Sequence, residues 1–148
     1  MSLQAWVGDR LERFNTSPAG LRKLLDAAVR QLADARIAGV SAETRFSVAY
    51  TAIRLLADLG LQANGYRALS SRAGHHQTAI QSLALTFGLD TATVSRLDAM
   101  RRQRNRTEYS ADVVSEAQVT ASLTDADALL QTARAWLKTH KPQVLSGT

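Results

Sequence analysis

Arginine is concentrated in one short stretch of this sequence. Residues 96–106 hold five arginines and one acid, so they carry a net charge of +4, and the whole chain carries +5. The stretch contains Arg96, Arg101, Arg102, Arg104, Arg106 and Asp98. A guanidinium donates two parallel hydrogen bonds to a phosphate through its planar fork. Charge gathered on one segment also attracts an anionic partner more strongly than evenly spread charge.

Arg104 lies where the next apolar contact of a helix is expected. Leu97, Arg101, Arg104 and Glu108 recur at three-and-four spacing, so they share one helix face. A charged residue on an inward face loses hydration unless it is paired or lies beside a wet groove. The predicted phosphate- or nucleic-acid-binding residues are Arg101, Arg104, Asn105 and Tyr109.

Two simpler interpretations remain open. Arg104, Asn105 and Tyr109 can form a structural hydrogen-bond network at a helix crossing or a dimer seam. The other arginines of the stretch can belong to an ordinary solvated helix face.

The elements that position these residues are all predicted to be helical, because nothing alternates with period two over a useful length. We expect an all-α, up-and-down antiparallel bundle of five to six helices. Helix-start signals occur at four places: Ser17 with Pro18, Ser41, Asp90 or Thr91, and Ser115 with Gln118. The expected helices are Leu3 to Phe14, Pro18 to Gly39, Ser41 to Leu59 with a break at Gly60, His75 to Gly88, Thr91 through the arginine stretch, and Ser115 to Leu137. Asn64 to Gly74 is expected to be a surface loop.

Length and composition favour one domain over residues 1–148, with an N-terminal extension (1–16) and a flexible tail (141–148). The absence of cysteine excludes disulfides, thiolate zinc sites and cysteine nucleophiles. No apolar run approaches membrane-spanning length and residues 1–14 lack a signal core, so we expect a cytoplasmic protein. His75 and His76 project about 100° apart on a helix, which suits local hydrogen bonds better than a shared metal. No cofactor or metal site is predicted.

Three segments stand out together: Arg101-Arg102-Gln103-Arg104-Asn105-Arg106-Thr107-Glu108-Tyr109 before a long terminal helix, Tyr50-Thr51-Ala52-Ile53-Arg54 within 46–59, and Gly74-His75-His76. These segments and the order of the expected elements resemble the HEPN domain family. The resemblance covers roughly residues 21–138. It implies a helical bundle that dimerises and either cuts RNA as a toxin or partners a nucleotidyltransferase-type antitoxin.

The catalytic half of the family's motif is missing. Active members have a histidine four to six positions after the arginine, whereas positions 108 to 110 are Glu108, Tyr109 and Ser110. The pattern resembles a divergent subgroup that reads Arg-Asn-x-x-x-Tyr. Histidine is the side chain suited to moving protons near neutral pH, and the remaining candidates for catalysis are Arg104, Glu108 and Tyr109.

We therefore expect a non-catalytic HEPN-type binding or interaction module. It is expected to form a homodimer and to contact RNA or a nucleotide through the arginine-rich helix. The alternatives are an RNA-cleaving HEPN ribonuclease with an atypical active site, and the regulatory partner of a nucleotidyltransferase-type antitoxin encoded nearby.

Overall fold

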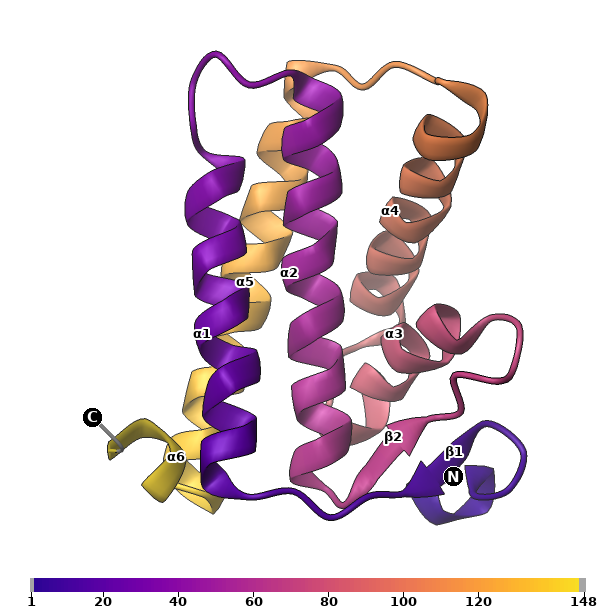
Figure 1. Ribbon diagram of the computed structural model, residues 1–148, viewed down its shortest axis with the longest axis vertical. Coiled ribbons are helices and arrows are strands. Elements are labelled where there is room, and N and C mark those ends of the chain that lie inside the picture. The colour runs from indigo at the N-terminus through magenta and orange to yellow at the C-terminus, as the bar shows by residue number, and fades with distance from the viewer. Residues whose placement is uncertain (1, 147–148) are drawn as a thin grey trace.

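Four long helices and two short ones form a bundle beside a small two-stranded antiparallel sheet (Figure 1). The structure is a computed structural model, and it describes residues 2–146. The helices are α1 (Pro18–Ala35), α2 (Ala42–Ala63), α3 (His75–Thr86), α4 (Thr91–Ser110), α5 (Glu116–His140) and α6 (Gln143–Ser146). A 3-10 turn, η1 (Leu3–Trp6), precedes the strands β1 (Leu11–Arg13) and β2 (Tyr66–Ala68). The predicted all-α bundle is confirmed.

Side-chain caps begin the long helices where the sequence indicates them. The hydroxyl of Ser17 accepts a hydrogen bond from the Gly20 amide, and Pro18 follows as the first helical residue. Asp90 caps α4 by accepting from the Thr93 amide at 2.8 Å. Ser115 and Gln118 form the predicted capping box at the start of α5. Each cap satisfies an amide that has no partner within its helix.

Helix α2 lies at the centre of the bundle. It packs against α1 and α5 on one side and against α3 and α4 on the other (Figure 1). Its apolar side chains Ile53, Leu56 and Leu59 are fully buried, and so is Tyr50. Burying such side chains stabilises the fold by roughly 1.5–3 kcal/mol each. Residues on α2 that face α3 and α4 are therefore held on a helix with many buried side chains.

Helix α4 is supported on one side only. It packs against α2 and α3, whereas a groove separates it from α5. The groove has a volume of about 310 Å³, and Phe46, Met100 and Ala121 contribute to its lining. The ion pair between Arg96 and Asp125 spans it at 3.3 Å.

The predicted helix from Leu3 to Phe14 is wrong, and so is the expectation that the chain has no strands. The 3-10 turn ends at Trp6, and β1 pairs antiparallel with β2, with Leu11 opposite Ala68. The strands have three residues each, too few to show an alternating pattern. Their hydrogen bonds also depend on a partner more than fifty residues away, which local spacing cannot reveal.

The predicted end of the second helix at Leu59 is also wrong. Helix α2 continues through Gly60 to Ala63. A β-carbon on Gly60 would lie 2.9 Å from the Thr86 hydroxyl and 3.0 Å from the Phe87 ring. The glycine thus allows the end of α3 to approach α2 closely, and it does not break the helix.

The region predicted to be a flexible tail contains α6, which lies against α1. Val144 is buried, and the Arg22 guanidinium donates hydrogen bonds to the carbonyls of Val144 and Leu145 at 3.0 and 3.1 Å. Residues 147 and 148 of that predicted tail lie outside the described residues. Between residues 2 and 146, no helix combines the length and apolar character needed to span a bilayer.

Candidate functional site

The inward face of α4 changes from apolar to charged along its length, as the sequence predicts. Leu97 is buried, and the side chains of Arg101 and Arg104 are only 16% and 23% exposed. By contrast, the side chains of Arg96, Arg102 and Arg106 are more than half exposed. The solvated-face interpretation therefore describes these three arginines but not Arg101.

Arg104 and Tyr50 face each other across the contact between α4 and α2. The guanidinium carbon of Arg104 lies 6.0 Å from the centre of the Tyr50 ring, and a terminal nitrogen lies 3.2 Å from the Glu108 carboxylate. The Nε of Arg104 and the hydroxyl of Tyr50 are buried and have no hydrogen-bond partner within the described residues. Buried polar atoms are rarely left unpaired, because each one costs roughly 1–3 kcal/mol.

Two further ion pairs fix the neighbouring arginines. Arg101 donates to Asp98 at 2.9 Å on α4, and Arg54 donates to Asp58 at 3.1 Å on α2. Tyr50, Arg54 and Asp58 are spaced four residues apart, so they share one face of α2. These pairs hold the guanidinium groups in place and leave part of each fork free, because a guanidinium has five N–H donors.

The first turn of α3 adds two histidines to this region. His75 and His76 make an edge-to-face contact with ring centres 4.3 Å apart. His75 makes the expected local hydrogen-bond contact, from Nδ1 to the Arg72 carbonyl at 3.3 Å. His76 is partly buried.

Burial lowers the pKa of the His76 imidazole to about 4, and nearby cations add to the effect. In order of influence these cations are His75, Arg54, Arg104 and Arg101. The His76 ring is therefore neutral at pH 7, with one nitrogen able to accept a hydrogen bond.

Burial acts in the opposite direction on the two acidic groups of α2. It raises the pKa of the Tyr50 phenol to about 12, although Arg101 and Arg54 oppose this. It also raises the pKa of the Asp58 carboxyl, against the opposing effects of Arg54 and His75. Tyr50 is thus a neutral hydroxyl that can donate a hydrogen bond to an anion.

We call this group of side chains the α2–α3–α4 cluster. It consists of Tyr50, Arg54 and Asp58 on α2, His75 and His76 on α3, and Asp98, Arg101 and Arg104 on α4. The structure brings the predicted residues Arg101 and Arg104 into it. Asn105 is partly buried, and Tyr109, predicted to act beside Arg104, points to solvent with 81% of its surface exposed.

Sequence reasoning missed the contributions of α2 and α3 to this cluster. The four-residue spacing of Tyr50, Arg54 and Asp58 was an available signal, because it puts a polar row next to the apolar stripe of α2. The influence of Arg104 on the pKa of His76 had no such signal, since it depends on how α3 and α4 cross.

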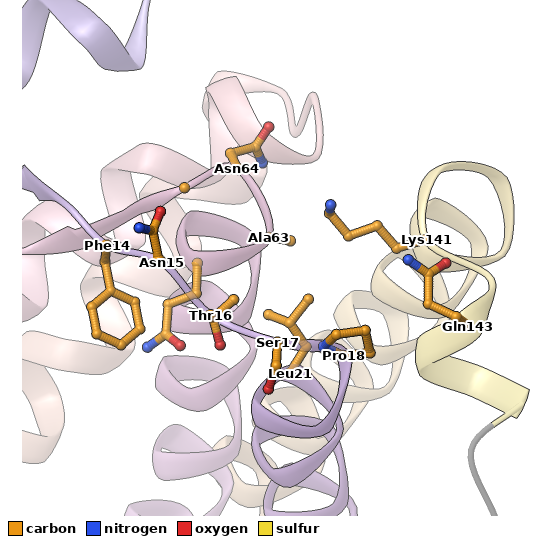
Figure 2. A pocket seen from close by; sticks show the side chains of 12 residues that line it. Phe14, Asn15, Thr16, Ser17, Pro18, Leu21, Ala63, Asn64, Lys141 and Gln143 are labelled. Atoms are coloured by element: carbon orange, nitrogen blue, oxygen red, sulfur yellow. The ribbon is translucent and has the colours of Figure 1, made fainter.

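Two hollows on the surface of the molecule lie away from this cluster, whereas a third, lined by Arg72, Gly74 and Gln77, borders His75 and His76. Figure 2 shows one of about 330 Å³ at the base of the bundle, where the side chains of Lys141 and Gln143 lie across from those of Asn15 and Thr16. Another is the groove between α4 and α5.

Within residues 2–146, no group of three or more histidines and acids is placed to hold a metal ion. No protein-family model matches the sequence, and no curated protein matches it.

Proposed function

We propose that this chain is an HEPN-like binding module whose α2–α3–α4 cluster binds phosphate groups of RNA or of a nucleotide. The observation that carries the proposal is the pair of buried, unpartnered donors, Arg104 Nε and the Tyr50 hydroxyl. The positive charges of Arg101 and Arg54 act on the Tyr50 phenol, where they oppose the rise in its pKa. A phosphate has enough acceptor oxygens to satisfy several such donors at once.

A purely structural network explains the cluster less well. Arg54, Arg101 and Arg104 each form an ion pair with one carboxylate. They leave the Tyr50 hydroxyl and Arg104 Nε unsatisfied at the contact between two helices. A network selected for stability alone would pair these atoms or replace them with apolar groups.

The test is fluorescence anisotropy with labelled single-stranded RNA at low salt. We expect Arg104→Gln to weaken binding about tenfold, or about 1.4 kcal/mol, because it removes a charged donor from the cluster. Arg102→Gln makes the same charge change on the same helix at an exposed position, and we expect less than about a threefold effect from it. Equal losses in both variants would mean that net charge, and not the cluster, attracts RNA.

Tyr50→Phe separates binding from folding. The substitution removes only a buried hydroxyl that has no partner in the described chain, so the free protein should keep or slightly gain stability. Binding of RNA should nevertheless weaken by several-fold if the hydroxyl contacts the ligand. A variant with unchanged affinity would remove Tyr50 from the proposed site.

The module is proposed to act as a homodimer. Tyr109 near the end of α4 and Val113 in the connection that follows it are each 81% exposed, so a second copy could cover them. Sedimentation velocity of the wild type and of Tyr109→Ser/Val113→Ser tests this. A wild type that stays monomeric across a hundredfold range of concentration would contradict it.

A second candidate function is RNA cleavage, and His76 is the observation that favours it. Burial and nearby cations lower the pKa of its imidazole to about 4, so the ring is neutral at pH 7 and could accept the proton of a ribose 2′-hydroxyl. The hydroxyl oxygen would then bond to phosphorus, and the 5′-oxygen would leave with a proton from water. In a gel assay, His76→Ala and Arg104→Ala should both abolish cleavage. Cleavage that survives both substitutions would come from a contaminant.

A further inference from the structure

The groove between α4 and α5 runs along a face of α4 that the α2–α3–α4 cluster does not use. Arg96, Ala99, Gln103 and Arg106 line it and recur at three- and four-residue spacing, so they share one face of the helix. The arginines of the cluster lie on the inward face instead. From Arg96 to Arg106 the groove follows α4 for roughly 15 Å, or about three turns.

Helix α5 forms the opposite wall with a similar row of side chains. Gln118, Ala121, Ser122 and Asp125 have the spacing i, i+3, i+4 and i+7, and Ala121 is exposed. The side chain of Phe46 on α2 contributes to the lining and is only 4% exposed. The groove therefore has two helical walls above an apolar floor.

This geometry suits a third helix better than an extended peptide. The backbone amides and carbonyls of the walls are bonded within their own helices, so an extended segment would find no main-chain partners, whereas a helix satisfies its own backbone. Ala99 on one wall and Ala121 on the other are small, which permits the close approach of packed helices. Met100, also in the lining, is flexible enough to adapt to an apolar side chain.

The charge beside the groove favours an acidic occupant. The side chains of Arg96 and Arg106 are 57% and 54% exposed, and they pair with Asp125 at 3.3 Å and Asp112 at 3.7 Å. A guanidinium has five N–H donors, so each arginine can keep its present partner and bind a second carboxylate. Nucleic acid fits poorly, because its phosphates would meet the Asp125 carboxylate and the apolar floor.

We propose that the groove between α4 and α5 binds an amphipathic helix of a partner protein. The bound helix has apolar side chains at i, i+3, i+4 and i+7 and acidic residues along the edges of that stripe. The apolar side chains pack over Phe46 and Met100, and the acids pair with Arg96 and Arg106. The surface is separate from the α2–α3–α4 cluster, so the proposal does not depend on phosphate binding there.

The probe is a labelled synthetic peptide of about 20 residues, long enough to populate a helix. It has leucines at the four stripe positions, glutamates beside them and alanines elsewhere, and its binding is followed by fluorescence anisotropy. We expect a peptide with lysines in place of the glutamates to bind at least about tenfold more weakly. A peptide of the same composition with scattered leucines should not bind. Failure of the acidic peptide to bind, or equal binding of the acidic and basic peptides, would overturn the proposal.

Ala121→Gln tests the location, because it puts a larger, uncharged side chain into the groove. Ala128→Gln is the matched control, since it makes the same change at an exposed position two turns further along α5, outside the groove lining. We expect Ala121→Gln to weaken peptide binding at least about tenfold and Ala128→Gln by less than about twofold. Circular dichroism checks that both variants fold. Equal effects of the two substitutions would place the peptide elsewhere and contradict the proposal.

Two further measurements distinguish the proposed partner from other occupants. Ala121→Gln should leave the oligomeric state in sedimentation velocity and the affinity for single-stranded RNA unchanged. If it dissociates a wild-type dimer, the occupant is a second copy of this chain, and the proposal is wrong. If it weakens RNA binding as much as peptide binding, nucleic acid occupies the groove, and the proposal is again wrong.

Discussion

An arginine turned toward a helical core needs compensation for lost water, and Arg104 obtains only part of it. Its guanidinium lies over the Tyr50 ring and next to Glu108, but Nε has no partner in the described region. Contact with an aromatic face and one ion pair each contribute about 0.5–1 kcal/mol at partly exposed sites. The remaining unpaired donor suggests that the position is occupied for function and not for stability.

At the residue scale, His76 should make the free protein less stable in acid. Its pKa is lower in the folded state, about 4, than the unfolded value of 6.5, so the unfolded chain binds more protons between these values. Stability is therefore complete above pH 6.5 and falls as the pH drops toward 4. Because the ring is partly exposed, we expect a loss of only about 1–2 kcal/mol from pH 7 to pH 5.

Urea denaturation at pH 7, 6 and 5 measures this loss. Asp58 acts in the opposite direction at the acidic end, since burial raises the pKa of its carboxyl in the folded state. The decisive quantity is therefore the difference between the wild type and His76→Gln, in which Asp58 is kept. Parallel stability curves for the two proteins would show that His76 is not the group responsible.

At the element scale, Gly60 should resist substitution even by alanine. A new methyl group would lie within about 3 Å of Thr86 and Phe87, so α3 must move away from α2. Overpacking of this kind costs about 1–3 kcal/mol, which exceeds the helix-propensity gain of up to 1 kcal/mol from alanine. Chemical denaturation of Gly60→Ala measures the loss, and adding Thr86→Ala should recover part of it. A Gly60→Ala protein as stable as the wild type would contradict the close approach of the two helices.

At the C-terminal end of α4, by contrast, a substitution to glycine should raise stability. Ala111 caps the helix with φ of +57°, a left-handed conformation that a β-carbon disfavours. We expect Ala111→Gly to raise stability by about 0.5–1 kcal/mol, measured by thermal unfolding. The control Ala135→Gly, at an exposed position inside α5, should instead lower stability by about 1 kcal/mol. A destabilised Ala111→Gly would mean that the end of α4 relaxes without strain.

How much of the architecture the sequence predicts depends on how local its signals are. Pro18 after Ser17, and Ser115 with Gln118, mark helix starts through contacts that span three residues, and both are confirmed. The pairing of β1 with β2 joins distant segments, and the role of Gly60 depends on a neighbouring helix. Neither leaves a local pattern.

The same distinction applies to the candidate site. Arg101 and Arg104 were predictable because they continue the spacing of Leu97 on one helix. The contact of Tyr50 with Arg104 depends on how α2 and α4 pack together, which no single-helix periodicity encodes. Tyr109 was predicted to join Arg104, yet it lies five residues further along α4 and so turns to solvent.

At the scale of the whole molecule, the positive charge should appear as a salt dependence of RNA binding. If Arg54, Arg101 and Arg104 each neutralise a phosphate, log K should fall against log salt with a slope of about −2. Arg104→Gln should make the slope less negative by about 0.7. The control Arg30→Gln makes the same charge change on an exposed position of α1 and should leave the slope unchanged. The slopes are measured by fluorescence anisotropy at salt concentrations from about 25 to about 200 mM. A flat dependence would exclude phosphate contacts.

The one-sided support of α4 has a consequence for how the site forms and disappears. Helix α4 packs on α2 and α3, and a groove separates it from α5. It can therefore detach while α1, α2 and α5 stay packed against one another. Such partial openings occur at lower free energy than global unfolding. Every detachment would separate Arg101 and Arg104 from Tyr50, so the proposed site would be disrupted more often than the whole protein unfolds. A bound phosphate that bridges the helices would slow amide exchange throughout α4 before it changed any other part of the molecule.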